Sequence, residues 1–411
     1  MPRTPRTLPF AAGAALLAAV LAACGSGAGA QSPDWRPQPS FAGEGPGVSI
    51  SPLVPAPTRS GSGADTGGGS PSGPSTPAPS SSAASRQDPS VVAKHLRAPV
   101  GLTLLPDGTA LVGERTTGRI VRVQPKPNQP VTLVRTLTGL STTGGGGLLD
   151  LALSPFYSQD GLIYAYITTA ADNRVVAFTL NGPVTPVVTG IPRGSTDNAG
   201  RIAFGANGDL YIGTGDAGHP ADAARRSNLA GKVLRVSDIG KPVADNPWPH
   251  SSVYTTGHRD PSGLCIDPDA GGVFETEAGT PSDEVNLIAA GASYGWPSGG
   301  GAAAQRPLAV LPSTDRSPGG CAVLDGVLYV TSLDGHALLA ARIGSRGSRI
   351  ALGGFKRTLV NRYGRLRTVV AAPDGALWLT TSNRDGHGQP IPADERVLRI
   401  VPSSGGANSV S

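Results

Sequence analysis

Six times along this chain a glycine-containing turn is followed at once by a short apolar strand, and this repeat limits the fold more than any other feature. The turns are Asp107-Gly108, Asp160-Gly161, Asn207-Gly208, Ala270-Gly271-Gly272, Asp325-Gly326 and Asp374-Gly375. Asx-Gly pairs are favoured in tight hairpins because the central residues of the turn need positive φ angles. After a polar gap a second strand follows each time; these strands begin near Arg119, Arg174, Lys232, Glu284, Leu338 and Arg396.

A period of about 50 residues built from short strands is typical of a β-propeller. We therefore predict an all-β fold, a six-bladed β-propeller, over residues 89–403, followed by a disordered tail at 404–411. Because propellers carry functional groups on loops around a central channel, the repeat also indicates where a site should lie.

The first part of the chain has the pattern of an export and lipidation signal. Arg3 and Arg6 precede an apolar run from Leu8 to Ala23 that is shorter than the roughly 20 residues that span a bilayer. Cys24 follows Leu-Ala-Ala, so we predict a lipoprotein signal peptide at 1–23 and a lipid on the Cys24 sulfur. An ordinary export signal with an incidental cysteine is the alternative.

Residues 24–88 are rich in Gly, Ser, Pro and Ala, which predicts a flexible tether. The predicted location is the outer face of the cell membrane, with the membrane as a partner through Cys24. The net charge is only +5 and no basic run is interleaved with aromatic residues, so nucleic-acid binding is not expected.

Two further cysteines, Cys265 and Cys321, each precede the turn of a blade by a few residues. They therefore occupy equivalent, innermost strands of neighbouring blades, and in an exported protein we expect them to form a disulfide. Two buried thiols are the alternative.

Two short stretches match enzyme motifs only by chance. Gly213–Gly218 has the spacing of a dinucleotide-binding loop but lies in an all-β repeat, and Gly291–Gly295 resembles a nucleophile elbow but is followed by Trp296-Pro297 and not by a helix. The six histidines show no metal-ligand spacing, and we expect most of them in surface loops.

Several longer stretches resemble the soluble quinoprotein glucose/sorbosone dehydrogenases. They occur in the order known in that family and cover nearly all of residues 91–402; they are Gly147–Leu153, Asp197–Asp216, Leu229–Arg235, Gly257–Leu264, Asp283–Ile288, Tyr294–Pro297 and Gly364–Arg367. The lipidation signal, tether and cysteine pair resemble most a subgroup of actinobacterial propeller lipoproteins of the LppZ type.

The resemblance implies a site for pyrroloquinoline quinone (PQQ) and Ca²⁺. Guanidinium groups suit its three carboxylates, and the resemblance places Arg259, Arg365 and Arg367 there. Asp216 matches the aspartate that supports the catalytic base. Gly279 and Thr280 match a pair whose carbonyls bind calcium, and Glu284 and Tyr294 match positions that bind a structural calcium pair. From the residues alone, Arg365 and Arg367 are equally well ordinary strand residues, Asp216 a turn cap, and the Tyr294–Pro297 stretch packing.

Acidic residues replace several groups that the family's chemistry needs. The base position holds Asp197, Asp260 stands for an asparagine, and Asp334 stands for a lysine. Carboxylates facing a trianionic cofactor are repulsive, although Asp197 and Asp334 are most simply solvated loop residues.

We therefore expect a divergent or non-catalytic relative that binds a sugar, glycan or protein ligand at the channel face. A PQQ- and Ca²⁺-dependent dehydrogenase acting on a sugar or alcohol is the alternative. A third possibility is that Asp197, Asp216, Asp260 and Asp334 hold a cation without quinone.

Overall fold

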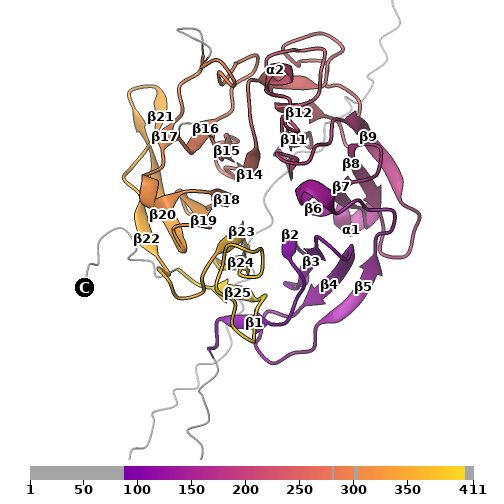
Figure 1. Cartoon of the computed structure of the whole chain (residues 1–411), viewed down its shortest axis with the longest axis vertical. Coiled ribbons are helices and arrows are strands. Elements are labelled where there is room, and N and C mark those ends of the chain that lie inside the picture. Colours follow the sequence, from indigo (N-terminus) through magenta and orange to yellow (C-terminus); the bar gives the residue numbers. More distant parts are fainter. Residues whose placement is uncertain (1–87, 280–281, 300–303, 403–411) are drawn as a thin grey trace, which may run out of the picture. The chain divides into compact units, whose positions relative to one another are not determined.

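The described residues form a ring of six antiparallel sheets in a computed structural model of the chain, which describes residues 88–279, 282–299 and 304–402 (Figure 1). Blade 1 contains β2 (Pro99–Leu104), β3 (Ala110–Glu114), β4 (Arg119–Val123) and β5 (Thr132–Thr136). Blade 2 contains β6 (Leu148–Leu153), β7 (Ile163–Thr168), β8 (Asn173–Phe178) and β9 (Thr185–Ile191). Blade 3 contains β10 (Ala199–Phe204), β11 (Leu210–Thr214), β12 (Lys232–Val236) and β13 (Val253–Thr256).

The other three blades complete the ring. Blade 4 contains β14 (Pro261–Ile266), β15 (Val273–Glu277), β16 (Glu284–Leu287) and β17 (Ala309–Val310). Blade 5 contains β18 (Pro318–Leu324), β19 (Val327–Ser332), β20 (Ala337–Arg346), β21 (Arg349–Leu352) and β22 (Lys356–Thr358). Blade 6 contains β23 (Leu366–Ala371), β24 (Leu377–Thr381) and β25 (Val397–Ile400), and its outermost strand is β1 (Val91–Ala93). The predicted six-bladed β-propeller is confirmed.

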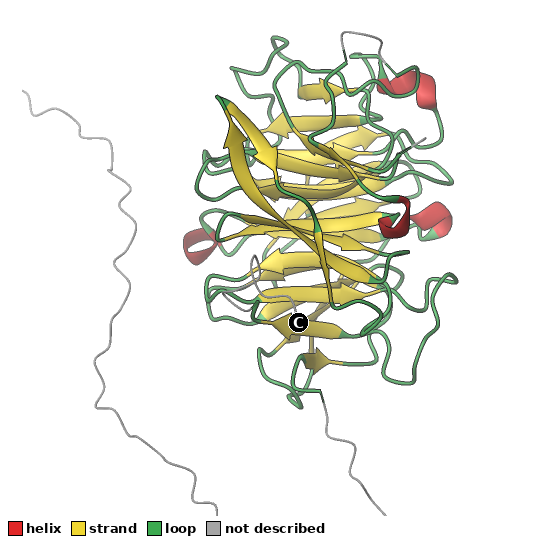
Figure 2. Ribbon diagram, turned by 90° about the vertical axis from the view of Figure 1, so that its left-hand side faces the viewer, coloured by secondary structure: helices red, strands yellow, loops and turns green. Residues whose placement is uncertain are grey.

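The pairing of β1 with β25 closes the ring, because it joins the first described strand to the last blade. Asp88, just before β1, accepts hydrogen bonds from Arg362 and from the Tyr363 hydroxyl at 3.0 and 2.8 Å. In side view the strands run between two loop-covered faces (Figure 2).

Each repeated turn has its glycine at positive φ, from 63° at Gly161 to 82° at Gly208. Among the preceding Asx residues only Asp325 also has positive φ. Asp107 and Asn207 instead accept the N–H of the residue two positions later at 3.0 and 3.2 Å, which is the other way in which Asx residues stabilise turns. At Asp160-Gly161 the prediction of a simple hairpin turn was wrong, because these residues end the short helix α1 (Tyr157–Asp160).

The core consists of six apolar clusters, one in each seam between neighbouring blades. The seam between blades 3 and 4 has the smallest of them, with five buried residues, whereas every other cluster has at least nine. Packing of sheet on sheet around the ring therefore holds the innermost strands in fixed positions.

No helix in the described ranges is long and apolar enough to cross a membrane. The predicted signal peptide, Cys24, the tether and the tail at 404–411 lie outside the described residues, apart from Asp88 at the end of the tether.

Candidate functional site

The arginines and aspartates that the sequence singles out lie at one end of the channel, where the innermost strands begin. Arg259 and Asp260 directly precede β14, Arg365 and Arg367 lie on either side of the first residue of β23, and Asp197 precedes β10. Because these strands are the innermost of their blades, their starts meet around the channel. We call this end the arginine–aspartate face.

Arg259 is the centre of a first group on this face. Its guanidinium lies 3.5 Å from an Asp197 carboxylate oxygen and over the Trp296 ring, 5.6 Å from the ring centre. Its carbonyl accepts the Asp216 N–H at 2.7 Å. The Trp296 Nε1–H in turn donates to Asp216 Oδ2 at 2.8 Å. Loops of blades 3 and 4 therefore combine a cation, two carboxylates and an aromatic ring.

Two aspartates of this group are held in conditions that favour the protonated form. Burial, with the nearby Asp197 charge, raises the pKa of Asp216, although hydrogen bonds from Gly218 and Trp296 oppose the shift. Burial and the Asp197 charge raise the pKa of Asp260 to about 6, although the Ala199 N–H donates to it at 2.9 Å. Asp216 also caps its turn, since the Gly218 N–H donates to Oδ1 at 2.7 Å.

A second group surrounds Arg365, which is only 6% exposed. Its Nη1 lies 2.5 Å from Asp334 Oδ1, and its Nε lies 2.9 Å from Asp385 Oδ2. Partial burial raises the pKa of Asp334, but hydrogen bonds from Ser317 and Arg365 outweigh it and leave the pKa below the usual value. The sequence suggested that Asp197 and Asp334 are solvated loop residues. In the structure each forms an ion pair instead, Asp197 with Arg259 and Asp334 with Arg365.

Arg367 interacts electrostatically with both groups, with Asp260 of the first and Asp385 of the second. Burial and the charges of Arg201 and Arg115 lower its pKa to about 10, while Asp385 and Asp260 oppose the shift. Its Nε is buried without a hydrogen-bond partner among the described residues. The channel therefore contains a concentration of positive charge just below the arginine–aspartate face.

Three of the four residues that the resemblance assigns to calcium lie in the described part of the chain, before, in and after β16. The Gly279 N–H donates to Asp283 Oδ1 at 3.1 Å, and Thr280 lies outside the described residues. Glu284 pairs across the sheet with Glu277, and burial raises its pKa. The Tyr294 hydroxyl donates to the Leu287 carbonyl at 2.6 Å, so this side chain packs as a strand neighbour.

All three predicted arginines have carboxylates of the chain near them. Of the three predicted arginines, Arg259 is paired with Asp197, and Arg365 is held by two carboxylates of the chain itself. Half-buried Asp260 adds a further acidic group near Arg367. A trianionic ligand would have to displace or approach these carboxylates, which repel it.

The third hypothesis from the sequence was a cation held by four aspartates without quinone. Within the described residues no cluster of metal-ligand spacing contains Asp197, Asp216, Asp260 or Asp334. The cluster that has such spacing consists of His258, Glu275 and Glu277, all buried. Five of the six histidines are exposed or half-buried, as expected, whereas His258 is buried because the folded loop carries it into the seam between blades 3 and 4.

Trp296 and Asp385 belong to the arginine–aspartate face, yet the sequence did not single them out. Trp296 was expected to pack, but its indole N–H donates to Asp216. The signal for it was the match of Tyr294–Pro297 to a family motif beside the site. Asp385 lies 20 residues after Arg365, and no spacing rule links them.

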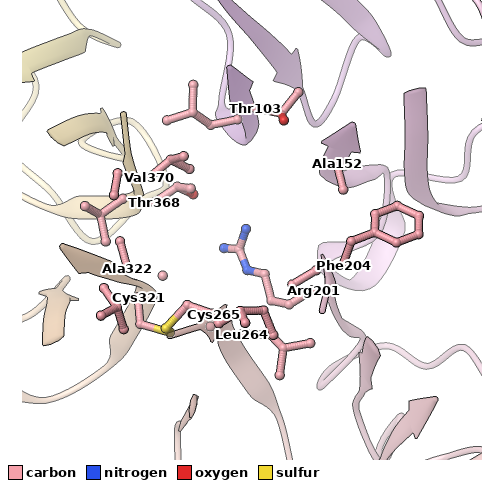
Figure 3. A pocket seen from close by; sticks show the side chains of 18 of the residues that line it. Thr103, Ala152, Arg201, Phe204, Leu264, Cys265, Cys321, Ala322, Thr368 and Val370 are labelled. Atoms are coloured by element: carbon pink, nitrogen blue, oxygen red, sulfur yellow. A yellow bond between two sulfur atoms is a disulfide. The ribbon is translucent and has the colours of Figure 1, made fainter. Parts of the chain in front are cut away.

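The opposite half of the channel is a cavity of about 600 Å³ lined by residues of all six innermost strands (Figure 3). The Arg201 side chain points into it, and Arg201 pairs with Asp150 at 3.6 Å. The predicted disulfide between Cys265 and Cys321 is confirmed; it joins β14 to β18 and forms part of the cavity wall (Figure 3).

Comparisons with known proteins agree with this architecture. The sequence model of the Glucose / Sorbosone dehydrogenase family matches residues 96–391. The PQQ-bound form of aldose sugar dehydrogenase from Streptomyces coelicolor is 40% identical, with a TM-score of 0.70, over 76% of this chain and 96% of that chain.

Curated relatives are matched over shorter stretches. Quinoprotein glucose dehydrogenase B of Acinetobacter calcoaceticus is 30% identical over 251 residues, 51% of this chain and 52% of the relative. An aldose sugar dehydrogenase of Escherichia coli is 30% identical over 173 residues, 38% of this chain and 47% of the relative. The chain thus spans about half the length of the curated relatives it matches. The propeller, its motif order and the match over residues 96–391 show that this chain belongs to the Glucose / Sorbosone dehydrogenase family.

Proposed function

We propose that this protein is a divergent, non-catalytic member of its family that binds a sugar or glycan at the arginine–aspartate face. The observation that carries the proposal is the double ion pair of Arg365 with Asp334 and Asp385, at 2.5 and 2.9 Å. In the family the arginine at this position would bind a quinone carboxylate, whereas here Arg365 forms ion pairs with carboxylates of the chain itself.

The size of the electrostatic effect supports this proposal. A carboxylate about 4 Å from a second carboxylate is disfavoured by ~1 kcal/mol in water and by ~4 kcal/mol at an effective dielectric constant of 20. Every ~1.4 kcal/mol lowers affinity tenfold. The affinity for a trianionic cofactor would therefore be lowered by several orders of magnitude by the four carboxylates of Asp197, Asp260, Asp334 and Asp385.

The same residues suit an uncharged polyhydroxyl ligand. Sugar hydroxyls donate to carboxylates such as Asp197 and accept from guanidinium groups such as Arg259, so a paired face still binds them. Arg259 is 31% exposed at its side chain and Asp197 18%, which leaves both reachable from solvent. The partly exposed Trp296 ring adds the apolar surface on which a sugar ring packs.

The proposal includes the location predicted from the sequence. Export, a lipid on Cys24 and a tether over residues 24–88 would hold the propeller at the outer face of the cell membrane. In that position the arginine–aspartate face would be available to glycans or to extracellular proteins.

A PQQ-dependent sugar dehydrogenase is the second candidate. It is favoured by the 40% identity to an aldose sugar dehydrogenase whose structure is PQQ-bound, and by three arginines that share one face. Bound quinone would supply hydride acceptance; Arg367, with its unpartnered Nε, is the residue best placed to contact it.

Binding and turnover measurements separate the two candidates. Full-length protein is titrated with PQQ and Ca²⁺ by calorimetry and assayed for aldose-dependent dye reduction. We expect no saturable quinone binding up to roughly 100 μM and no turnover, together with binding to a subset of probes on a glycan array. Saturable binding with turnover would establish the dehydrogenase instead.

The double variant Asp197→His with Asp334→Lys tests the assignment of the face itself. It restores the residue types that the resemblance places there, so it should raise quinone affinity at least tenfold. Asp238→Asn, in the exposed turn after β12 of blade 3, is the control and should leave quinone affinity unchanged. An unchanged affinity in the double variant would mean that these positions do not face the quinone.

A further inference from the structure

The seam between blades 3 and 4 combines the smallest apolar cluster of the ring with a buried polar one. Its polar residues are His258, Glu275, Glu277 and Asn286, of which none is more than 4% exposed. His258 follows β13 of blade 3, whereas the other three lie on β15 and β16 of blade 4. The polar cluster thus lies between blades 3 and 4, beside the smallest apolar cluster of the described ring.

Three atoms that can act as metal ligands lie close together in this cluster, and His258 Nδ1 and Glu277 Oε2 are within hydrogen-bond distance. His258 Nδ1 lies 3.2 Å from Glu277 Oε2 and 3.9 Å from Glu275 Oε2, and the three ligand atoms lie within 4.8 Å of one another. Two ligands bound about 2.1 Å from one ion are separated by roughly 3 to 4 Å. The other ring nitrogen, Nε2, is 2.9 Å from the Thr255 hydroxyl. When that contact takes the ring proton, Nδ1 faces the carboxylates as a free ligand.

Two oxygen atoms of the cluster have no hydrogen-bond partner although their side chains are fully buried. They are Glu275 Oε1 and Asn286 Oδ1. The Asn286 amide donates to Glu275 Oε2 at 2.9 Å, and a half-turn of that amide exchanges its nitrogen and oxygen. The amide oxygen then lies beside the carboxylate as a fourth ligand.

The charge of the two buried glutamates also favours a bound cation. Glu275 and Glu277 are two buried carboxyl groups beside one imidazole, and buried charges are normally paired or bound to metals.

We propose that His258, Glu275, Glu277 and Asn286 bind one divalent transition-metal ion, Zn²⁺ or Mn²⁺, in the seam between blades 3 and 4. The imidazole ligand favours these ions over Ca²⁺, which prefers oxygen ligands alone. The site is separate from the calcium positions implied by the family resemblance, because it uses neither Gly279, Glu284 nor Tyr294 as a ligand. Tyr294 stacks on the His258 ring at 4.6 Å and covers it.

The ion also fixes the arginine–aspartate face from below. Glu277 Oε1 accepts the Arg259 N–H, while Glu277 Oε2 faces the proposed ion. The metal ion therefore ties β15 and β16 to the loop between β13 and β14 and holds the Arg259 backbone in place, whichever ligand the face binds.

Metal analysis of the full-length protein tests the proposal. Protein produced in medium containing Zn²⁺ and Mn²⁺ and purified without chelator should contain about one equivalent of one of them by mass spectrometry. Removal with a strong chelator should lower the melting temperature by roughly 5 °C, because the ion binds only the folded state. Zn²⁺ or Mn²⁺ should restore it, whereas Ca²⁺ and Mg²⁺ should not.

Isosteric variants distinguish a metal ion from a shared proton. Glu275→Gln should reduce metal content at least tenfold and abolish the response to chelator. Glu114→Gln is the control for loss of a buried carboxylate: Glu114 has in blade 1 the position that Glu277 has in blade 4, is 2% exposed and accepts the Arg97 N–H. It belongs to no cluster of metal-ligand spacing among the described residues. This control should keep its metal. Wild-type protein without Zn²⁺ or Mn²⁺, together with an unchanged melting temperature in Glu275→Gln, would overturn the proposal in favour of a protonated Glu275.

Discussion

At the scale of single residues, the arginine–aspartate face is characterised by carboxylates that lie close to one another and to arginines. Asp260 shows this most clearly, because it is held close to the Asp197 carboxylate. The Ala199 N–H donates to an Asp260 oxygen, and an asparagine oxygen would accept that bond equally well. An acid at this position therefore has an energetic consequence that an amide lacks.

Replacing Asp260 by asparagine should stabilise the protein in a pH-dependent way. The folded-state pKa is raised from 3.8 to about 6, so the folded protein keeps the proton where the unfolded chain has lost it. The resulting loss of stability grows as the pH rises from about 4 to about 6 and is complete above that range. At pH 7 Asp260→Asn should be more stable by about 1–3 kcal/mol.

Urea unfolding at pH 4, 5 and 7 measures this difference. The gap between Asp260→Asn and wild type should close toward pH 4. Asp269→Asn, in an exposed turn, should show a small gap at every pH. An equal stabilisation by Asp260→Asn at all three pH values would contradict the assigned cause.

At the scale of elements, side chains buried at strand ends shape the loops that carry the face. Lys232, the first residue of β12, is fully buried and donates from Nζ to the carbonyls of Asp222 and Ala223 at 2.9 Å and of Ala230 at 2.5 Å. These carbonyls belong to the loop that contains α2 (Pro220–Ala223) and begins at Asp216. Lys232 thus holds this loop closed next to the site.

Lys232→Met should lower the free energy of unfolding by about 3 kcal/mol, because the carbonyls lose their donors while remaining buried. Chemical unfolding measures it, and protease cleavage within residues 217–230 should accelerate in parallel. Lys241→Met, at an exposed lysine of the same blade, should change stability by less than about 0.5 kcal/mol. Equal effects of the two substitutions would show that the buried Nζ does not support the loop.

The elements could be predicted from the sequence because the turns repeat and each glycine needs its positive φ. Much of the candidate site could not. Asp385 reaches Arg365 only through the fold of the loop after β24, which no motif marks. Glu275 and Glu277 alternate along one strand and hence point to the same side, a signal that could have identified the buried cluster. His258 could not be placed with them until the register of β13 and β14 was known.

At the scale of the whole molecule, ring closure depends on β1, which has three residues, all buried. A variant beginning at Lys94 removes Val91, Val92 and Ala93 from the core. At about 1.5–3 kcal/mol for each larger buried side chain, the loss of roughly 5 kcal/mol is a large part of a typical domain's stability. A variant beginning at Gln87 keeps β1 and serves as the control.

Thermal unfolding followed by circular dichroism compares the two truncations. The variant beginning at Gln87 should melt like the full chain, whereas the one beginning at Lys94 should melt at least roughly 5 °C lower and expose blade 6 to proteases first. Identical melting of the two would show that the ring is held closed without β1.

The closing strand also has a mechanical consequence. All 87 residues that precede the described part of the chain connect to the propeller through Asp88 and β1. A pulling force on that segment therefore acts first on the short β1–β25 ladder and on the contacts of Asp88 with Arg362 and Tyr363, before it reaches any other blade. The chain is therefore attached at the strand that closes the ring, so tension on the chain and opening of the ring are coupled.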